Sequence, residues 1–448
     1  MKPTPLRVLA DLLQGKLSGD PDLRVTGFAT DSGGGKPGDL FLAIKGARVD
    51  GHEFVAEALR TGAVAAVVER PVDGPHILVE NLVDALARMG STLRSGFDGP
   101  VIAITGSAGK TTTKEFVAAA LSPLGSVLKS EGNRNTEYTS PLLWMDLEPD
   151  HRAVVVEMAM RGFGQIRHLA EFTRPTDALI TNIGYSHLEQ VGSREGIADA
   201  KGELLETLPE NGVAILWHED EFLERLSKKT KAKVRTFGYD PGADCLITSY
   251  RALDWDACEV GGTLDGIPWE ARLPAVGKHI GLNAAAAVLT VAGLGVAPQE
   301  AAEALKGARI PPMRMEIVEH RGARVLLDTY NASPPSMIAA IETLSDLPAT
   351  GRRRAVIGEM RELGDHREAA HRLVGQALAQ NGLDEVILFG EPVHFVREAA
   401  MEAGMEASHI GIADSIDDVR AFLDRTEPGD AILIKGSRAL ELERALKP

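Results

Sequence analysis

Cysteine is scarce in this chain of 448 residues, which contains only Cys245 and Cys258. Two cysteines are too few for the disulfide framework of a small secreted protein, and their spacing does not match a zinc-binding motif. We therefore expect two free, buried thiols and a reducing compartment.

The chain is also short of positive charge and of long apolar runs. Its 48 lysines and arginines are outnumbered by 64 aspartates and glutamates, giving a net charge of −16. This balance argues against general binding to nucleic acid or anionic membranes. No apolar stretch approaches the roughly 20 residues of a membrane-spanning helix, and charges interrupt the N-terminal segment too often for a signal peptide. We expect a monomeric, cytoplasmic protein without membrane insertion.

Length and pattern together predict an α/β protein of three domains. A chain of this size exceeds what one hydrophobic core usually supports. Strand-like and helix-like segments alternate over residues 1–98, a small α/β unit that ends before Gly99 and Pro100. The central unit, residues 99–310, has the pattern of a phosphate-loop ATPase with a parallel sheet. Residues 311–448 alternate strands and helices as a Rossmann-like, doubly wound domain does.

One stretch of the central unit carries the strongest functional signal. Residues 101–105 are typical of a buried parallel strand, and a helix-like segment begins near Lys114. Between them, two glycines precede a Lys-Thr pair, an arrangement in which backbone N–H groups and a helix N-terminus bind phosphate. The lysine is expected to reach the β- and γ-phosphates, and the first threonine to bind Mg²⁺. The expected ATP-binding residues here are Gly106, Ser107, Ala108, Gly109, Lys110, Thr111 and Thr112.

The spacing within this loop is shorter than in the general phosphate-loop motif. That motif has four residues between the first glycine and Gly-Lys-Thr, whereas only Ser107 and Ala108 stand between the two glycines here. The alternative is an ordinary strand-to-helix turn with a surface lysine. The apolar strand before the loop and the helix after it favour a nucleotide site.

Polar side chains also follow two other strand-like segments of the central unit. Glu157 ends one apolar run, and Asn182 and His187 follow the next. Ligands of open parallel sheets collect at the carboxyl ends of the strands. These three side chains are therefore expected to face the same crevice as the phosphate loop.

The order of these motifs resembles the Mur ligase family, the ATP-dependent amino-acid and peptide ligases of bacterial cell-wall synthesis. The resemblance covers nearly the whole chain. It rests on the phosphate loop, Gly132-Asn133-x-Asn135, Glu157-Met158, Asn182-Ile183-x-x-x-His187, Ala200-Lys201-Gly202-Glu203, Gly277-x-His279-x-x-x-Asn283, Arg314, residues 328–337, residues 358–364 and Lys435-Gly436-Ser437-Arg438. Within the family, the last three segments are similar to the ligases that add D-Ala-D-Ala to UDP-N-acetylmuramoyl-tripeptide.

The resemblance implies roles for individual residues. It implies that Lys110, Glu157, His187 and Lys201 are catalytic. It implies one Mg²⁺ held by Thr111 and Glu157, and a second beside His187 and Lys201, with Lys201 converted by CO₂ to a carbamate. Further ATP contacts are implied for Asn283, Arg314 and Asp328. Contacts with the UDP-linked substrate or the dipeptide are implied for Asp31, Ser32, Asn135, Asn331 and Ser336.

The implied reaction proceeds through an acyl phosphate of the tripeptide, which the amine of D-Ala-D-Ala attacks to give the UDP-pentapeptide, ADP and phosphate. Two alternatives stay open. One is a related ligase that adds a single amino acid to a UDP-muramoyl peptide. The other belongs to a different class, a phosphate-loop ATPase whose nucleotide state controls a partner.

The chain departs from the family pattern in two places. The family usually has Asp-Ser-Arg where this chain has Asp31, Ser32 and Gly33, so an arginine expected to contact the uridine nucleotide is missing. Residues 136–139 read Thr-Glu-Tyr-Thr, where the family tends to have asparagine and glycine. Both departures fall on segments expected to meet the substrate.

Overall fold

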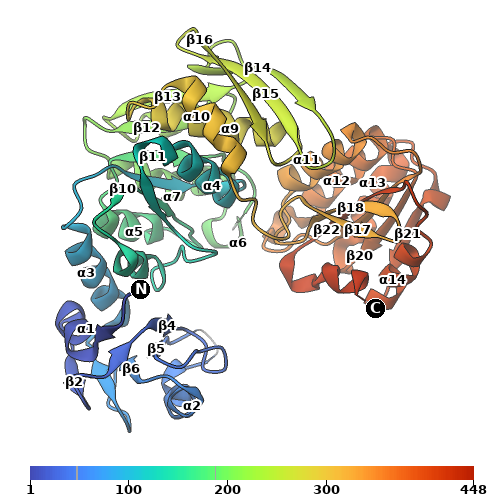
Figure 1. Ribbon diagram of the computed structural model, residues 1–448. Helices are drawn as coiled ribbons and strands as arrows, with labels where there is room; N and C mark the ends of the chain where they lie inside the picture. Colours follow the sequence, from blue (N-terminus) through green and yellow to red (C-terminus); the bar gives the residue numbers. More distant parts are fainter. Residues whose placement is uncertain (47–48, 187, 448) are drawn as a thin grey trace.

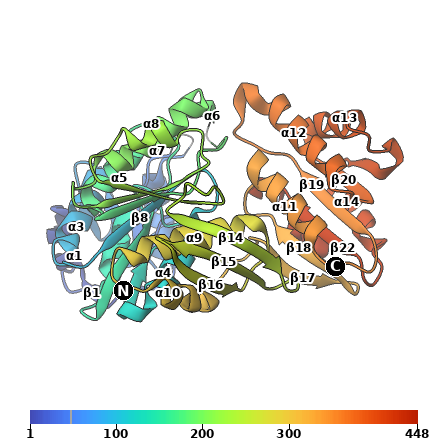
Figure 2. The same ribbon diagram turned by 90° about the horizontal axis from the view of Figure 1, so that it is seen from above.

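The computed structural model describes residues 1–46, 49–186 and 188–447, and its strands form three large sheets and one small pair. Figure 1 shows the three sheets in three bodies, with the N-terminal body below the central one and the C-terminal body beside it. The expected three-part α/β fold is confirmed. In the view from above (Figure 2), the C-terminal body faces the central one along one side.

The first body contains a five-stranded sheet in the order β2-β7-β6-β5-β4. Adjacent side chains of a strand point to opposite faces, so Leu40 and Leu42 pack with α1 and α3, whereas Phe41 packs with α2. The elements are β1 (Thr4–Pro5), α1 (Leu6–Leu13), β2 (Lys16–Ser18), β3 (Arg24–Val25), β4 (Gly27–Ala29), β5 (Asp39–Leu42), α2 (Val55–Thr61), β6 (Ala65–Val68), β7 (His76–Leu78) and α3 (Leu82–Arg94).

The central body is built on a nine-stranded sheet in the order β16-β15-β14-β13-β12-β11-β8-β10-β9. The strands from β14 to β9 are parallel, and the meander β14–β16 extends the same sheet in antiparallel pairs. Its strands are β8 (Val101–Thr105), β9 (Ser126–Lys129), β10 (His151–Glu157), β11 (Asp177–Ile180), β12 (Val213–Trp217), β13 (Lys233–Gly238), β14 (Cys245–Ala252), β15 (Cys258–Leu264) and β16 (Ile267–Leu273).

Helices cover both faces of this sheet, which explains why the first four residues of β8 are apolar. Ile102 and Ile104 pack with α4, α9 and α10, and Val101 and Ala103 pack with α5 and α7 on the other face. The helices are α4 (Lys110–Ala120), α5 (Gln165–Thr173), α6 (Leu188–Val191), α7 (Arg194–Glu206), α8 (Leu223–Ser227), α9 (Lys278–Ala292) and α10 (Pro298–Ala304).

The C-terminal body has a six-stranded sheet in the order β17-β18-β22-β19-β20-β21, parallel except for the edge strand β17. A helix of this body begins at Pro334, with a capping box between Ser333 and Ser336. The elements are β17 (Glu316–His320), β18 (Ala323–Asp328), α11 (Pro334–Asp346), β19 (Arg353–Gly358), α12 (Arg367–Gln380), β20 (Glu385–Phe389), α13 (His394–Glu402), β21 (Ile410–Ala413), α14 (Ile416–Asp424) and β22 (Ala431–Lys435).

Two expectations from composition can be compared directly with the structure. Cys245 and Cys258 are free and buried, and burial raises the pKa of each thiol to about 12. Across the described part of the chain, no helix combines the length and apolarity needed to cross a membrane.

Candidate active site

The phosphate loop connects the end of β8 to the start of α4, as the sequence predicts. Gly109 caps the helix with φ of +79°, and Gly106 has φ of +147°. A Cβ atom on Gly106 would lie 1.9 Å from Oγ1 of Thr181. Glycine is therefore required at this position by both the backbone conformation and the space available.

The end of the neighbouring strand β11 holds this loop in shape. The N–H groups of Ser107 and Ala108 donate to the backbone oxygen and the Oδ1 of Asn182, each at 3.0 Å. The N–H of Gly184 donates to Oγ of Ser107 at 2.8 Å. Lys110 Nζ donates to the carbonyl of Gly106 at 2.8 Å. These protein contacts stabilise the loop conformation.

Glu157 ends β10 beside the loop and is 2% exposed. Asn135 Nδ2 donates to Oε1 of Glu157 at 2.8 Å, and the Glu157 N–H donates to Oγ of Ser130 at 3.1 Å. The other carboxylate oxygen, Oε2, has no hydrogen bond among the described residues, and Lys114 Nζ lies 3.8 Å from it. A buried carboxylate oxygen without a hydrogen-bond donor is suited to bind a cation.

Lys201 lies on α7 and is 1% exposed. Burial and the nearby charge of Lys110 lower the pKa of Lys201 well below its ordinary value. Burial also lowers the pKa of Lys110, against the opposing effect of Glu157. Within the described ranges, no carboxylate forms an ion pair with Lys201. Both lysines therefore have a larger neutral fraction than a surface lysine has at the same pH.

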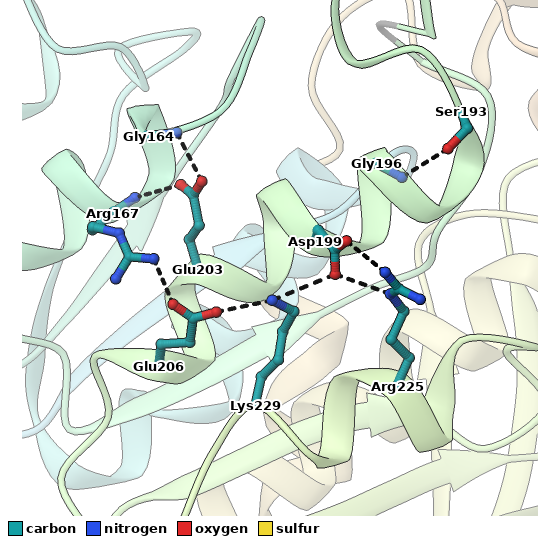
Figure 3. A network of polar contacts seen from close by, with 9 residues as sticks. All are labelled: Gly164, Arg167, Ser193, Gly196, Asp199, Glu203, Glu206, Arg225 and Lys229. Atoms are coloured by element: carbon teal, nitrogen blue, oxygen red, sulfur yellow. Dashed lines mark hydrogen bonds and ion pairs between the residues drawn. The ribbon is translucent and has the colours of Figure 1, made fainter.

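The opposite side of α7 is fixed to its neighbours by a polar network (Figure 3). The Glu203 carboxylate accepts hydrogen bonds from the N–H groups of Gly164 at 2.7 Å and Arg167 at 3.1 Å, at the start of α5. Glu206 pairs with Arg167 and Lys229 on the exposed side. The segment that follows Glu157 and the helix that carries Lys201 are thus joined through Glu203.

The C-terminal body contributes side chains to the same site. Asp328 ends β18 and pairs with the buried Lys435 at the end of β22, and Lys435 Nζ also donates to the carbonyl of Asn331 at 2.9 Å. The guanidinium of Arg314 stacks over the Tyr330 ring at 4.0 Å. Parallel strands end at the same edge of their sheet, which is how residues far apart in sequence meet here.

A cavity of about 460 Å³ lies between the central and C-terminal bodies. Its wall includes most residues expected from the sequence, namely Ser107, Ala108, Gly109, Lys110, Thr111, Thr112, Asn135, Glu157, Asn283, Arg314, Asp328, Asn331 and Ser336. Gly106 lies at the base of the loop and Lys201 is buried behind it, and neither lines this cavity. His187 lies outside the described residues.

The cavity wall also contains residues that sequence analysis missed. An apolar part is formed by Trp217, Phe237, Ile280, Leu282 and Ile310, from segments spread over nearly one hundred positions of the chain. No single stretch of sequence signals such a surface. His279 also lines the cavity, and its motif was part of the resemblance, although no role was assigned to it.

A second cavity, of about 430 Å³, lies between the first body and the central one. Asp31 lines it, whereas Ser32 lies beside it with its Oγ donating to Glu57 at 3.2 Å. Arg134 lines this second cavity and the next residue, Asn135, lines the first. Residues 134 and 135 therefore connect the two cavities.

Family profiles match three parts of the chain, the first two of which overlap. They are described as the Mur ligase family catalytic domain (residues 24–127), the Mur ligase middle domain (104–291) and the Mur ligase glutamate ligase domain (313–438). The chain belongs to the Mur ligase family. It is an ATP-dependent ligase that forms amide bonds.

Similar Mur ligases match over nearly the full length. The UDP-N-acetylmuramoyl-tripeptide–D-alanyl-D-alanine ligase of Bacillus subtilis is 34% identical over 98% of this chain and 96% of its own. The Escherichia coli ligase of the same name is 32% identical over 99% and 97%. The crystal structure of MurF from Acinetobacter baumannii has a TM-score of 0.86 at 31% identity, covering 99% of this chain and 98% of its own.

MurF of Thermotoga maritima, solved in complex with ADP, has a TM-score of 0.80 at 31% identity and covers 94% of this chain and 96% of its own. The folylpolyglutamate synthase of Mycobacterium tuberculosis is similar at 18% identity, with a TM-score of 0.63. The similarity to the folylpolyglutamate synthase shows only that the two proteins share a fold.

Proposed function

We propose that this Mur ligase joins D-Ala-D-Ala to UDP-N-acetylmuramoyl-tripeptide, with conversion of ATP to ADP and phosphate. The observation that carries the proposal is the full-length similarity, at 30% identity or more, to ligases named for this reaction. A Thermotoga maritima ligase named for adding alanine is similar at 19% identity, which supports a common fold and no common substrate.

The phosphate loop and Lys110 bind the ATP phosphates in this proposal. The backbone N–H groups of the loop and the N-terminus of α4 attract anions, and Lys110 Nζ can exchange its bond to the Gly106 carbonyl for a phosphate oxygen. The terminal carboxylate of the tripeptide then attacks the γ-phosphorus and ADP leaves. The amine of D-Ala-D-Ala attacks the acyl phosphate, expels phosphate and loses a proton.

Glu157 and Thr111 are the residues that we propose to hold a Mg²⁺ ion. The hydrogen-bond-free Oε2 of buried Glu157 and the position of Thr111 on the cavity wall support this assignment. When bound, the metal supplies charge neutralisation for the phosphate oxygens. Asn135 orients the other carboxylate oxygen of Glu157.

Lys201 is proposed to carry a carbamate, formed when its neutral amine attacks CO₂ and loses a proton. The low pKa that burial gives Lys201 supports this reaction, because only the neutral amine is nucleophilic. The product is an anion next to the cationic Lys110. With His187 it would hold a second Mg²⁺.

We propose that the nucleotide contacts Arg314, Asp328 and Asn283. The incoming dipeptide is proposed to contact Asn331 and Ser336. Asn283 Oδ1 accepts a hydrogen bond from Thr113 of α4 at 3.1 Å, which places its amide beside the phosphate loop. The Ser336 hydroxyl already takes part in the capping box of α11, so any substrate contact would share that oxygen. The acyl phosphate is sensitive to water, and enclosure between two bodies protects it.

We further propose domain divisions between residues 98 and 99 and between 310 and 311, a monomer, and a cytoplasmic location. The three sheets, which span residues 16–78, 101–273 and 316–435, support these divisions. ATP and UDP-linked precursors are both present in the cytoplasm, which supports the location. Light scattering tests the monomer.

The decisive experiment measures phosphate release from ATP and Mg²⁺ with four substrate combinations. UDP-N-acetylmuramoyl-tripeptide, with lysine or diaminopimelate as third residue, is offered with and without D-Ala-D-Ala. The UDP-linked dipeptide is offered with and without free lysine or diaminopimelate. Release that requires tripeptide and D-Ala-D-Ala supports the proposal. Release only with dipeptide and amino acid identifies a ligase of the preceding step, and equal release in all four mixtures, independent of the incoming amine, identifies an ATPase.

A further inference from the structure

Helix α4 carries a second lysine that the proposed reaction does not use. Lys114 lies four residues after Lys110, on the same face of the helix, and its side chain is 1% exposed. Its Nζ lies 3.4 Å from Oε1 of Glu115 and 3.8 Å from Oε2 of Glu157. A buried ammonium is stable only beside opposite charge, so Lys114 depends on these two carboxylates.

The two carboxylates differ in what else they contact. Oε2 of Glu115 pairs with Nζ of Lys129 on β9, and the Lys129 side chain is 26% exposed. Oε1 of Glu157 accepts the hydrogen bond from Asn135. Among the described residues, Lys114 is the only ion-pair partner of Glu157 within 4 Å. The two lysines and two carboxylates form one cluster whose formal charges cancel, and within it Lys114 neutralises Glu157.

The separation of Lys114 from Glu157 matters for a metal ion. At 3.8 Å the ammonium attracts the carboxylate but is too far away to donate a hydrogen bond to Oε2. A divalent cation can therefore bind Oε2 without breaking a hydrogen bond. That cation and the Lys114 ammonium would share one carboxylate, and their like charges repel. The charge of Glu157 also acts on Lys110, but Lys110 is assigned to the ATP phosphates.

We propose that Lys114 is the built-in counter-ion of Glu157. It neutralises the buried carboxylate while no metal is bound, and it lowers the affinity of this carboxylate for Mg²⁺. The inference rests on the proposed function, in which Glu157 holds Mg²⁺. Lys114 is a positioning residue in this scheme, because it acts through Glu157 and does not line the cavity. The site therefore stays neutral before the metal binds, with a weaker metal affinity as the result.

The first test measures the binding of Mn²⁺ by electron paramagnetic resonance in Lys114→Met and in the matched control Lys129→Met. Each variant removes one cation from the cluster, but only Lys114 contacts Glu157. Glu157→Gln measures the Mn²⁺ that binds elsewhere on this acidic chain. Lys114→Met should lower the Kd of the Glu157-dependent site about 10-fold or more. The control should change this Kd less than about 2-fold, since Lys129 is partly exposed and pairs with Glu115.

The second test follows thermal unfolding in the absence of divalent cations. Lys114→Met leaves Glu157 buried without its counter-ion, so the Tm of the central body should fall by about 6–20 °C. The double variant Lys114→Met/Glu157→Gln removes both charges and should recover most of this loss. Added Mg²⁺ should raise the Tm of Lys114→Met more than that of wild type, because tighter binding to the folded state stabilises it further.

The outcomes separate this inference from the proposed function. Tighter Mn²⁺ binding in Lys114→Met, together with recovery of the Tm in the double variant, supports the counter-ion role. Unchanged or weaker Mn²⁺ binding overturns it, and weaker binding would mean that Lys114 orients the carboxylate for the metal. A double variant as unstable as Lys114→Met also overturns it, even where Lys114→Met is too unstable for a metal titration. Wild-type binding is measured first, since Mn²⁺ binding that Glu157→Gln leaves unchanged rejects the proposed Mg²⁺ assignment itself, and with it the inference.

Discussion

The Glu203→Gln substitution tests the link between α7, the helix that carries Lys201, and the start of α5, in the segment that follows Glu157. Both oxygens of the buried Glu203 carboxylate accept backbone N–H groups at the start of α5 (Figure 3). Glutamine keeps one acceptor and presents an N–H₂ group to the second N–H, which belongs to an exposed residue and loses its hydrogen bond at a cost of about 0.5–1.5 kcal/mol. Loss of a negative charge at a helix N-terminus adds about 0.3–1 kcal/mol. The expected destabilisation is therefore about 1–2.5 kcal/mol.

Thermal unfolding monitored by circular dichroism measures this effect. For a domain as large as the central body, each kcal/mol shifts the Tm by about 2–4 °C, so we expect a decrease of about 2–10 °C in its transition. Glu206→Gln is the matched control on the same helix, since its partners Arg167 and Lys229 lie on the solvent side and exposed ion pairs contribute about 0–1 kcal/mol. Equal Tm values for the two variants would refute the reasoning.

Three other substitutions test separate parts of the proposal, and a fourth tests the pH dependence of stability. Lys110→Met should reduce ATP-dependent phosphate release at least about a hundredfold with no loss of Tm, and retained turnover would exclude the phosphate role. Lys201→Ala should lose activity and recover part of it with added formate or acetate, and full activity without any rescue would argue against a carbamate. Asp328→Ala leaves the buried Lys435 without its carboxylate and should weaken ATP use, so an unchanged dependence of the rate on ATP concentration would argue against a role for the C-terminal body. Burial lowers the pKa of His371 from its ordinary 6.5, so the unfolded chain binds more protons in acid and stability should fall below about pH 6.5. Urea unfolding at pH 7.5 and 5.5 should show a smaller difference for His371→Gln than for wild type, and an equal difference would assign the acid sensitivity to other groups.

Features encoded in contiguous residues could be predicted from the sequence. The phosphate loop is predictable because strand, glycine turn and helix follow one another within about twenty positions. The start of α11 at Ser333 and Pro334 is equally local. Helix α3 was not predicted, although Asn81 followed by apolar residues at 82, 85, 86 and 89 gives a helical pattern. The strands β2, β7 and β21 have three or four residues each, too few for a periodic pattern.

The sequence by itself determined the family, the three α/β units and the phosphate loop, because these depend on local pattern and on the order of motifs. Only the tertiary structure decided which groups are chemically unusual. In the sequence, Lys201 looks like any other lysine of a helix. It becomes a buried amine with a lowered pKa only because α7 packs in the central body. Glu157 likewise acquires a buried carboxylate oxygen without a hydrogen bond among the described residues. Desolvation and unsatisfied polar atoms arise from contacts between distant segments, so no stretch of sequence contains them.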